Sequence, residues 1–575
     1  MVVKNISACI LTLSLLGISG FLSAQSAGNK PDSSCSNLRT GGQQKSGIRF
    51  ENRQPKSGIN FVLNNGTTPY KPIIDSTLGG VALFDFDNDG LLDIFFTNGA
   101  RIPGLSKDKN FENHLYRNNH NGTFTDMTEH AGLKGEGYSM GVAAADFDND
   151  GWADLYVTGV NRNILYHNNH DGTFTDVTQR AGVGGMDAAG KKLWSVGAAW
   201  LDYDNDGYLD LFVANYLDWS LENSKMCGEE GRRLSCSPAL YSGLPNLLYH
   251  NNGDGTFTDV SATSGIGQHI GKGMSVAVAD YDGDGFIDIF VANDQQRNFL
   301  FKNNAASKFT ELGVEAGVAY TEDGLPLSNM GVDFRDLNDD GRPDIAITAL
   351  SGETFPVYLN LGNGLFTPVT YRSGLGFQTL RMSGWGIGAY DFDNDGHKDL
   401  FTANSHVSEN ADFYGHDHYK QPNAVLRNMG DTCFQDVTSQ AGAAMQSADA
   451  HRGSAFGDLN NDGRIDVVVS VIGKPAELLY NASSGNSHWI LIQLEGTKSN
   501  RDGIGTRIKL TSDSGLVQYN QVSTAVGYAS SSDKRVHFGL GGDRRIRELE
   551  LHWPSGKIQV LKNIAADQVL KIRGD

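Results

Sequence analysis

Cysteine, basic residues and long apolar runs are all scarce in this sequence, and each shortage excludes a class of protein. Only 5 of the 575 residues are Cys, too few for the dense cysteine framework of thrombospondin-type calcium repeats. Beyond the N-terminus no stretch reaches the roughly 20 apolar residues that a membrane-spanning helix needs. Lys and Arg number 47 against 67 Asp and Glu, a net charge of -20. Such an acidic surface repels phosphate backbones, which argues against nucleic-acid binding.

Familiar catalytic motifs are missing as well. The chain has no Gly-x-Ser-x-Gly nucleophile elbow, no His-Glu-x-x-His zinc motif and no phosphate-binding loop. These absences favour a binding protein over an enzyme, although an exported enzyme remains the alternative from a different class.

The N-terminus has the pattern of an export signal. Lys4 supplies a positive charge, residues 10–22 form an apolar run, and small residues follow that suit cleavage. We therefore assign residues 1–27 to a signal peptide and residues 28–45, rich in Ser, Gly and Gln, to a flexible linker. This predicts a secreted, extracellular protein, or a periplasmic or cell-surface one if the source is bacterial.

The cysteines that remain after export would meet oxidising conditions. Cys227 and Cys236 close a short loop within one insertion, so we predict a disulfide between them. Cys35 and Cys433 are either free or paired with each other, and the sequence does not decide between these alternatives.

What the chain has in abundance is a repeat. Glycine is frequent, at 70 residues, and turn-forming residues separate many short apolar runs. Seven segments share one nine-residue acidic pattern: Asp85–Asp93, Asp146–Asp154, Asp202–Asp210, Asp280–Asp288, Asp336–Asp344, Asp391–Asp399 and Asp458–Asp466. Their spacing is about that of a four-stranded propeller blade with its loops.

The flanks of the acidic pattern repeat too. A strand of small residues precedes each pattern, an apolar strand follows it, and a strand–turn–strand signature comes next, as in LYRNNHNGTFTDMT from Leu115. The seventh unit stops after Tyr480-Asn481 without its outer strand. Residues 46–62 resemble the missing piece, and pairing them with the seventh unit would close the ring and remove free sheet edges. We therefore predict an all-β fold with a seven-bladed β-propeller over residues 46–485.

Each acidic pattern is suited to hold a calcium ion. Short oxygen-bearing side chains alternate at positions 1, 3 and 5, Gly at position 6 permits a sharp turn, and Asp at position 9 can bind with both oxygens. Hard oxygen ligands in this number suit Ca²⁺ better than Mg²⁺ or zinc. Without cations, three or four carboxylates in each small loop would repel one another. We predict about seven structural Ca²⁺ ions.

The ligands, including the main-chain carbonyl at position 7, are predicted to be the following residues. They are Asp85, Asp87, Asp89, Leu91, Asp93; Asp146, Asp148, Asp150, Trp152, Asp154; Asp202, Asp204, Asp206, Tyr208, Asp210; Asp280, Asp282, Asp284, Phe286, Asp288; Asp336, Asn338, Asp340, Arg342, Asp344; Asp391, Asp393, Asp395, His397, Asp399; and Asp458, Asn460, Asp462, Arg464, Asp466. An EF-hand would need an acid at position 12, where this chain has strand residues such as Phe96 and Val157. A metal-free acidic turn would explain one loop, but seven in register make it a poor explanation.

These repeats resemble those of FG-GAP/VCBS proteins, whose integrin-α members place such loops in a seven-bladed propeller. Three C-terminal segments, Ser499–Leu510, Gly527–Gly541 and Leu551–Ile564, resemble the ASPIC/UnbV domain. The combination resembles the cartilage acidic protein family and its bacterial relatives. The resemblance implies an extracellular calcium-binding architecture but no agreed biochemical activity.

The C-terminal region, residues 486–575, also shows its own pattern. Seven short alternating segments separated by turn signals predict a small β-sandwich: Trp489–Leu494, Thr506–Leu510, Val517–Val522, Arg535–Phe538, Ile546–His552, Ile558–Leu561 and Val569–Ile572.

A ligand is expected on the face of the ring opposite the acidic loops. Both long insertions, Tyr216–Pro245 and Ser405–Pro422, fall on that face, and long loops on a rigid scaffold often carry function. Candidate ligand-binding residues there are Asn98, Tyr138, Trp194, Asn215, Lys272, Asn293, Arg381, Trp385, Asn404, His406 and Arg452. For the asparagines, turn chemistry is an alternative explanation.

Three functions follow from this organisation. The first is a secreted binding or adhesion module for an extracellular protein or glycan, with calcium in a structural role. The second is an exported enzyme whose active site lies in the propeller funnel opposite the acidic loops. The third is a purely structural matrix or envelope component.

Overall fold

The computed structural model describes residue 35 and residues 45–305, 308–415 and 417–575. The expected signal peptide and most of the expected linker lie outside the described residues. Among the helices of the described part, none is long and apolar enough to cross a membrane.

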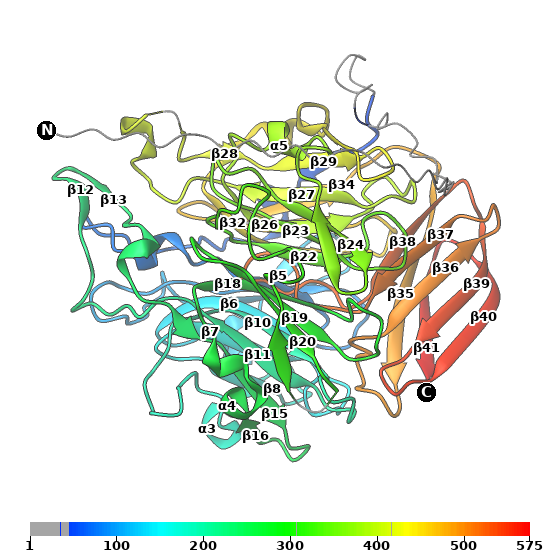
Figure 1. Ribbon diagram of the computed structural model, residues 1–575, viewed down its shortest axis with the longest axis horizontal. Helices are drawn as coiled ribbons and strands as arrows, with labels where there is room; N and C mark the ends of the chain where they lie inside the picture. Colours follow the sequence, from blue (N-terminus) through cyan, green and yellow to red (C-terminus); the bar gives the residue numbers. More distant parts are fainter. Residues whose placement is uncertain (1–34, 36–44, 306–307, 416) are drawn as a thin grey trace, which may run out of the picture.

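Strands dominate the fold, and most of them form sheets of four antiparallel strands (Figure 1). Seven such sheets lie between Phe50 and Asn481, and we number them by the order of their acidic loops. Their strands, from the first of each sheet to the last, are β2 (Val81–Phe84), β3 (Asp93–Phe96), β4 (His114–Asn118), β5 (Phe124–Asp126); β6 (Tyr138–Ala145), β7 (Asp154–Val160), β8 (Ile164–Asn168), β9 (Phe174–Asp176); β10 (Ser195–Leu201), β11 (Asp210–Asn215), β15 (Leu247–Asn251), β16 (Phe257–Asp259); β18 (Gly273–Ala279), β19 (Asp288–Asn293), β20 (Phe299–Asn303), β21 (Phe309–Glu311); β22 (Val332–Arg335), β23 (Asp344–Ile347), β24 (Val357–Gly362), β25 (Leu365–Pro368); β26 (Gly384–Tyr390), β27 (Asp399–Asn404), β29 (Ala424–Asn428), β30 (Phe434–Asp436); and β32 (His451–Gly457), β33 (Asp466–Val471), β34 (Glu477–Asn481), β1 (Phe50–Asn52).

The remaining elements of this region are short. They are the pairs β12 (Cys227–Glu229) with β13 (Arg232–Leu234), β14 (Leu244–Pro245) with β17 (Ile270–Gly271) and β28 (Gln421–Pro422) with β31 (Ala448–Asp449); the helices α1 (Gln54–Ser57), α2 (Thr128–Ala131), α3 (Thr178–Ala181), α4 (Ser261–Ser264) and α5 (Leu375–Gln378); and the 3-10 turns η2 (Ile73–Ser76), η3 (Pro238–Leu240), η4 (Ile266–Gln268), η5 (Ala411–Phe413), η6 (Thr438–Gln440) and η7 (Ala443–Gln446).

The seven sheets form a closed ring. The first strands contact one another in a cycle that runs β2, β6, β10, β18, β22, β26, β32 and back to β2. The seventh sheet is completed from the other end of the chain, because β1 pairs with β34 in the register Phe50 to Asn481, at the place where the sequence leaves an outer strand missing. The two ends of the ring are thereby joined by hydrogen bonds, and the last sheet has no free outer edge at β34.

Small residues in the first strands allow the ring to be tight at its centre. At Gly141 in β6, an added Cβ would lie 2.3 Å from the carbonyl oxygen of Val196 in the next sheet. Such a distance is shorter than any real contact, so the approach of β6 to β10 requires glycine. The apolar second strands, such as β7 and β19, are buried along their whole length between neighbouring sheets.

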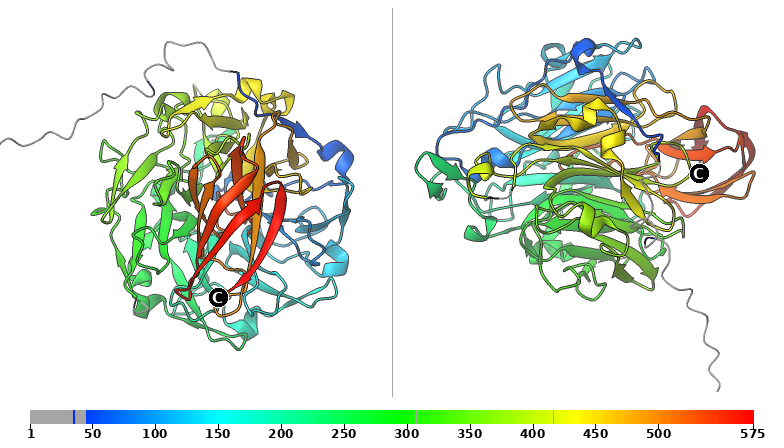
Figure 2. Two further views of the ribbon diagram at one scale, coloured as in Figure 1. Left: turned by 90° about the vertical axis from the view of Figure 1, so that its right-hand side faces the viewer. Right: turned by 90° about the horizontal axis from the view of Figure 1, so that it is seen from above.

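The C-terminal region forms two further sheets that lie over the middle of the ring (Figure 2). A three-stranded sheet has the order β38 (Val536–Gly541), β35 (His488–Gly496), β41 (Gln568–Gly574), and a four-stranded sheet has the order β37 (Val517–Gln521), β36 (Arg507–Ser512), β39 (Arg545–His552), β40 (Ile558–Ala565). All seven strands overlap the segments that alternation predicts. β35 and β41 pair in parallel, and the other pairs in these sheets are antiparallel.

The connection between β37 and β38 enters the centre of the ring. We call residues 524–533 the central segment. Its main chain bonds to four of the first strands: Ser531 to Val81 and Leu83 in β2, Ala529 to Val142 in β6, Gly527 to Val332 in β22, and Asp533 to Phe456 in β32. These bonds satisfy inner-strand groups that have no partner within their own sheets.

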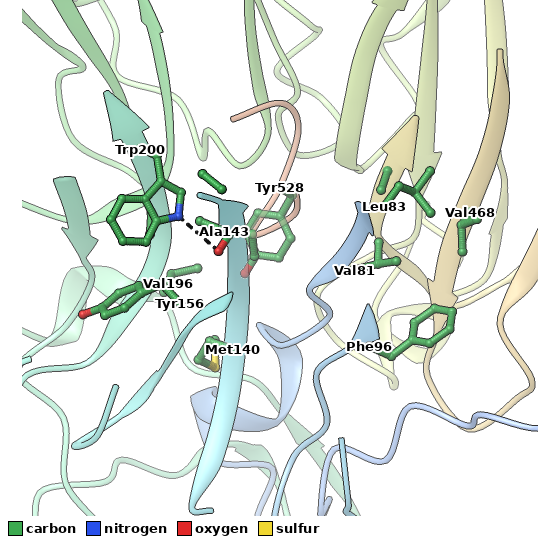
Figure 3. Packing of buried hydrophobic residues seen from close by; sticks show 14 of the residues in the cluster. Val81, Leu83, Phe96, Met140, Ala143, Tyr156, Val196, Trp200, Val468 and Tyr528 are labelled. Carbon is green, nitrogen blue, oxygen red and sulfur yellow. Dashed lines mark hydrogen bonds between the residues drawn. The ribbon is translucent and has the colours of Figure 1, made fainter. Parts of the chain in front are cut away.

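Tyr528 is the largest side chain of the central segment, and it is fully buried. It lies among residues of the first sheets, near Met140 and Ala143 of β6 (Figure 3). Its ring packs edge-on against Trp385 at 4.9 Å, and its hydroxyl donates to the carbonyl of Thr77. Residues of the central segment and its flanks belong to three hydrophobic clusters that also contain residues of the ring. The ring and the C-terminal region are therefore packed together through shared clusters.

Candidate functional site

Each acidic loop joins the first and second strands of its sheet and is held by its own carboxylates. In the first loop, Asp85 accepts from the backbone N–H groups of Asp89 and Gly90, at 3.1 and 2.9 Å. Asp89 accepts from the N–H of Leu91 at 3.0 Å. Asp93 at position 9 is buried and accepts from the N–H of Phe86 at 3.0 Å and of Asn118 at 2.8 Å. The loop is therefore shaped by the same oxygens that are predicted to bind calcium.

The partner of position 9 is an asparagine that the sequence analysis did not assign a role. It lies at or within two residues of the end of the third strand, and its amide nitrogen also donates to two carbonyls, one at position 8 of its own loop and one at position 2 of the preceding loop in the ring. Asn118, for example, donates to Leu92 and to Leu459 of the seventh sheet. All seven sheets have this arrangement, with Asn118, Asn168, Asn251, Asn303, Asn360, Asn428 and Asn481.

Position 4 forms a second link from loop to loop. Its residue adopts a positive φ, and in five loops its amide nitrogen donates to the Gly carbonyl at position 6 of the next loop, as Asn88 does to Gly151 at 3.0 Å. The fourth loop has Gly283 at this position, and the fifth has Asp339, which lies 3.6 Å from Lys398. These links place the acidic loops side by side on one face, the acidic-loop face.

The donor set fits a cation. The carboxylates at positions 1, 3 and 9 come within 4.8 Å of one another in the first two loops. In four loops, one carboxylate oxygen of position 3 is buried and has no hydrogen-bond partner: Asp87, Asp148, Asp204 and Asp393. An unpartnered buried carboxylate oxygen is costly unless a cation coordinates it. Positions 1, 3, 5 and 9, with the carbonyl at position 7, would hold the ion and leave it a structural role.

Burial dominates the electrostatics of these carboxylates. It raises the pKa of Asp154 and Asp210 at position 9 to about 7, and the pKa of Asp202 at position 1 to about 8. Ionisation of carboxyl groups in a small buried loop is unfavourable in free energy. A divalent cation bound to them would stabilise the ionised form.

A basic side chain also contacts every acidic loop. Five come from the third strand of the same sheet: Arg117, His167, His250, Lys302 and Arg427. In the fifth and seventh loops, which have Asn at position 3, the basic residue is position 7 itself, Arg342 or Arg464. These cations reduce the repulsion within each loop and would compete with a metal ion for the same oxygens.

The C-terminal region covers the acidic-loop face. Asp146 donates its N–H to Asp502 at 2.9 Å, and Arg507 lies 3.2 Å from Asp280. Arg535 donates to the carbonyl of Asp458 at 3.0 Å and to the side chain of Asn461 at 2.7 Å. The C-terminal region therefore packs directly against the acidic loops.

On the opposite face, which we call the insertion face, most of the predicted ligand-binding residues are buried. They are Asn98, Tyr138, Trp194, Asn215, Lys272, Asn293, Trp385, Asn404 and Arg452. The asparagines bind the backbone of their own turns, as Asn215 does to the carbonyl of Pro245 at 2.8 Å. Arg381 is exposed and His406 is half-buried. Only part of the predicted set therefore faces solvent.

The two insertions meet over this face. The amide of Asn410 donates to the carbonyl of Arg233 at 2.7 Å, and the hydroxyl of Tyr414 donates to the carbonyl of Arg232 at 2.9 Å. The predicted disulfide between Cys227 and Cys236 is present in the first insertion, and Cys35 is paired with Cys433. In Figure 1 the β12–β13 hairpin projects on the side away from the C-terminal sheets.

Two pockets lie beneath the joined insertions and share Ser76, Ser235 and Val407. One reaches Trp385 and Asp294, where Tyr216 donates to the Asp294 carboxylate at 2.6 Å. Burial raises the pKa of Asp294 to about 7. The other pocket runs from Lys71 inward to Arg452. The insertion face thus has two small pockets where the insertions meet, one lined mainly by apolar side chains and the other mainly by polar ones.

Family comparisons agree with these repeats. A family model described as the FG-GAP-like repeat matches residues 85–157, 146–213, 240–291, 280–347 and 336–402. A second model, ASPIC and UnbV, matches residues 496–575. The chain belongs to the FG-GAP repeat family. It ends in an ASPIC/UnbV domain.

Human cartilage acidic protein 1 is 23% identical over 447 residues, which are 76% of this chain and 62% of the human protein. The chain therefore matches less than two thirds of that relative's length. Among solved structures, BBS1N in complex with ARL6DN is similar with a TM-score of 0.42 at 11% identity, over 77% of this chain and 99% of that one. The Dos1 propeller is similar with a TM-score of 0.35 at 9% identity, over 70% and 93%.

The FG-GAP match ends at residue 402, but the geometry of the repeat continues. In the seventh loop Asp458 accepts from Asp462 and Gly463, and Asp466 accepts from Leu459 and Asn481, as their counterparts do in the first loop. The seventh loop, outside the matched residues, thus has the same hydrogen-bond geometry as the first.

Proposed function

We propose that this FG-GAP protein is an extracellular binding module. Its acidic loops would hold about seven structural Ca²⁺ ions in a seven-bladed propeller of the integrin-α kind. The ASPIC/UnbV domain, which we interpret as a β-sandwich, would cap the propeller on that side. The ligand, an extracellular protein or glycan, would bind on the insertion face, in a role that includes adhesion.

One observation carries this proposal: the C-terminal sheets occupy the acidic-loop face, whereas the insertion face carries two long loops that meet above pockets. Because one face of the ring is covered, a ligand would bind on the other face. Long loops on a rigid scaffold are suited to ligand recognition. The two disulfides and the relation to cartilage acidic protein 1 support secretion.

A binding screen tests the proposal. The calcium-loaded protein is applied to a glycan array and to a panel of secreted proteins, beside a double variant, Asn410→Ala with Tyr414→Phe, that separates the insertions. We expect the double variant to lose the interactions that the native protein makes. A matched control, Arg573→Gln, changes an exposed residue of the C-terminal sheets and should bind normally. If Arg573→Gln abolishes binding and the double variant does not, the ligand face is wrong.

A further inference from the structure

A buried histidine at the start of the seventh sheet has a ring nitrogen that makes no hydrogen bond. His451, the first residue of β32, is fully buried. Its Nδ1 lies 3.1 Å from the carbonyl oxygen of Asn404 and 3.0 Å from that of Gln421. Both partners are acceptors, so Nδ1 carries a proton and donates it. Nε2 has no hydrogen-bond partner, and in the neutral ring it therefore has a free lone pair in the protein interior.

Two buried carboxylates lie beside this nitrogen. Glu477, the first residue of β34, has its Oε2 atom 3.4 Å from Nε2 of His451. Asp449 of β31 offers a further oxygen, and the three ligand atoms lie within 4.8 Å of one another. Each carboxylate is oriented by a neighbour, Glu477 by the amide of Asn423 at 2.8 Å and Asp449 by the hydroxyl of Ser447 at 2.9 Å. Hydrogen bonds of this kind, including the one from Nδ1, orient the ligands at metal sites.

The distance between His451 and Glu477 fits a coordinated ion. Zinc bonds to histidine nitrogen and to carboxylate oxygen at about 2.0 to 2.1 Å, so two such ligands at a tetrahedral angle lie about 3.3 Å apart. A charge-assisted N–H···O bond would be shorter, at about 2.8 Å. The observed 3.4 Å matches the first value. One imidazole and two carboxylates suit a first-row transition metal, whereas Ca²⁺ takes more ligands, all of them oxygen.

Neither His451 nor Glu477 belongs to the repeat. The residue 15 places before position 9 is His451 in the seventh sheet, and in the other sheets it is Leu78, Ser139, Ser195, Gly273, Asn329 or Gly384. The residue four places before the third-strand asparagine is Glu477 in the seventh sheet, and elsewhere it is His114, Ile164, Leu247, Phe299, Pro356 or Ala424. No other sheet has a histidine at the first of these places or a carboxylate at the second. The sheets of this ring therefore form without this pair of side chains.

Two cations compete for these ligands. The ammonium group of Lys474 pairs with Asp449, but the Lys474 side chain is 51% exposed and can move into solvent. A proton competes for Nε2, because burial lowers the pKa of His451 but the Glu477 and Asp449 carboxylates outweigh burial and raise it. One divalent ion would balance the charge of both carboxylates with the imidazole neutral.

We propose that Nε2 of His451 and the carboxylates of Glu477 and Asp449 bind one divalent transition-metal ion of the zinc class. The site lies toward the insertion face, since β32 and β34 both begin there, and it reaches solvent at Lys474. It goes beyond the proposed function, because it is separate from the acidic loops and from calcium. The ion would join β31, β32 and β34 in the sheet that closes the ring.

Calorimetric titration with zinc chloride, in excess Ca²⁺ to limit zinc binding at the acidic loops, tests the proposal. The native protein should bind one equivalent of Zn²⁺ that Glu477→Gln and His451→Gln each bind about 100-fold more weakly. Lys474→Gln removes a competing cation and should bind this equivalent about 10-fold more tightly. The matched control is His418→Gln, which alters an exposed histidine 2.8 Å from Asp412 and should leave this equivalent unchanged.

A crystal soaked in Zn²⁺ locates the ion, because anomalous scattering should show a peak between Nε2 of His451 and the Glu477 carboxylate. Equal zinc affinity in the native protein and in Glu477→Gln, or a peak confined to the acidic loops, would overturn the inference and leave a buried ion pair. Displacement of the zinc by excess Mg²⁺ would reject a nitrogen ligand. If His451→Gln fails to fold, Glu477→Gln and Lys474→Gln still decide the question. The proposed calcium sites and ligand face would stand in each case.

Discussion

The two faces of the ring are covered in different ways. The acidic-loop face has seven nearly identical loops under a folded domain, whose side chains are joined to them by hydrogen bonds and ion pairs. The insertion face has seven dissimilar connections, of which two are long and touch through a few side chains. Repetition therefore serves stability on one side, and irregularity leaves room for recognition on the other. The following predictions test that contrast, from the largest expected effect to the smallest.

Removal of calcium should affect the acidic-loop face most. Each occupied site would add stability by mass action, so chelation with EDTA should lower the melting temperature by at least about 10 °C. Differential scanning calorimetry measures the effect. Ca²⁺ should restore the melting temperature and Mg²⁺ should not, because the loops offer flexible oxygen ligands. Asp89→Ala should weaken one sheet and cause a much smaller shift.

An unchanged melting temperature in EDTA would indicate that basic side chains, and not a metal ion, neutralise the loop carboxylates. It would mean that Arg117 and its counterparts in the other loops neutralise the carboxylates without a metal. The calcium assignment would then be wrong for these loops.

Truncation of the central segment should destabilise both faces. Tyr528→Ala would remove a fully buried ring that packs on Trp385, and it should cost about 3 to 5 kcal/mol in the free energy of unfolding. Tyr528→Phe keeps the ring and loses only the hydroxyl bond to Thr77, so it should cost about 1 to 2 kcal/mol. Urea titration followed by fluorescence measures both variants. Equal costs would show that the ring contributes no packing.

The third-strand asparagines should matter more than their exposed neighbours. Asn251→Ala would leave the carbonyls of Leu209 and Phe147 without their donor, at a cost of about 2 kcal/mol. The control is the next residue, Asn252, which is exposed and bonds to Thr256; its replacement by Ala should cost less than about 1 kcal/mol. Urea denaturation compares the two variants. If Asn252→Ala cost more stability than Asn251→Ala, the proposed role of Asn251 in joining the sheets would be wrong.

Acid should loosen the C-terminal sheets. Burial lowers the pKa of His537 to about 4, and its Nε2 lies 3.2 Å from the carbonyl of Gly463. Lys398 adds a smaller effect in the same direction. The unfolded chain binds a proton near pH 6.5 and the folded one does not, so this residue's contribution is complete above pH 6.5 and is lost as the pH falls toward 4.

Protonation of His537 can change the free energy of unfolding by at most about 1.4 kcal/mol per pH unit. Stability measured from pH 7 to pH 4 in the native protein and in His537→Gln isolates it. The variant should show the shallower decline, and an identical decline would assign the acid sensitivity to other groups.

Much of the ring could be predicted because its information is local and repeated. The spacing of Asp85, Asp146 and their counterparts indicates both the sheets and the loops, and alternation in residues 486–575 locates the C-terminal strands. The role of Asn118 could not be predicted in the same way, although an asparagine recurs there, since its partners lie in two different sheets.

The position of the central segment was still harder to predict from the sequence. Thr524–Asp533 lies between two predicted strands and is rich in small polar residues, and its partners are strand edges that exist only once the ring is built. The candidate ligand residues show the same limit. Asn98 and Asn293 occupy the expected connections, but their side chains bind backbone carbonyls of those connections, at Glu112 and Arg297.

The central segment also has a consequence for biosynthesis. The ribosome makes it after every strand of the ring, so the inner strands leave the ribosome before their axial partners exist. Until that stretch arrives, backbone groups such as the N–H of Val142 and Leu83 line an unfilled core. The nascent protein is therefore exposed to misassembly until this stretch has been made, and a chain truncated before residue 524 would lose the segment around which the sheets are arranged.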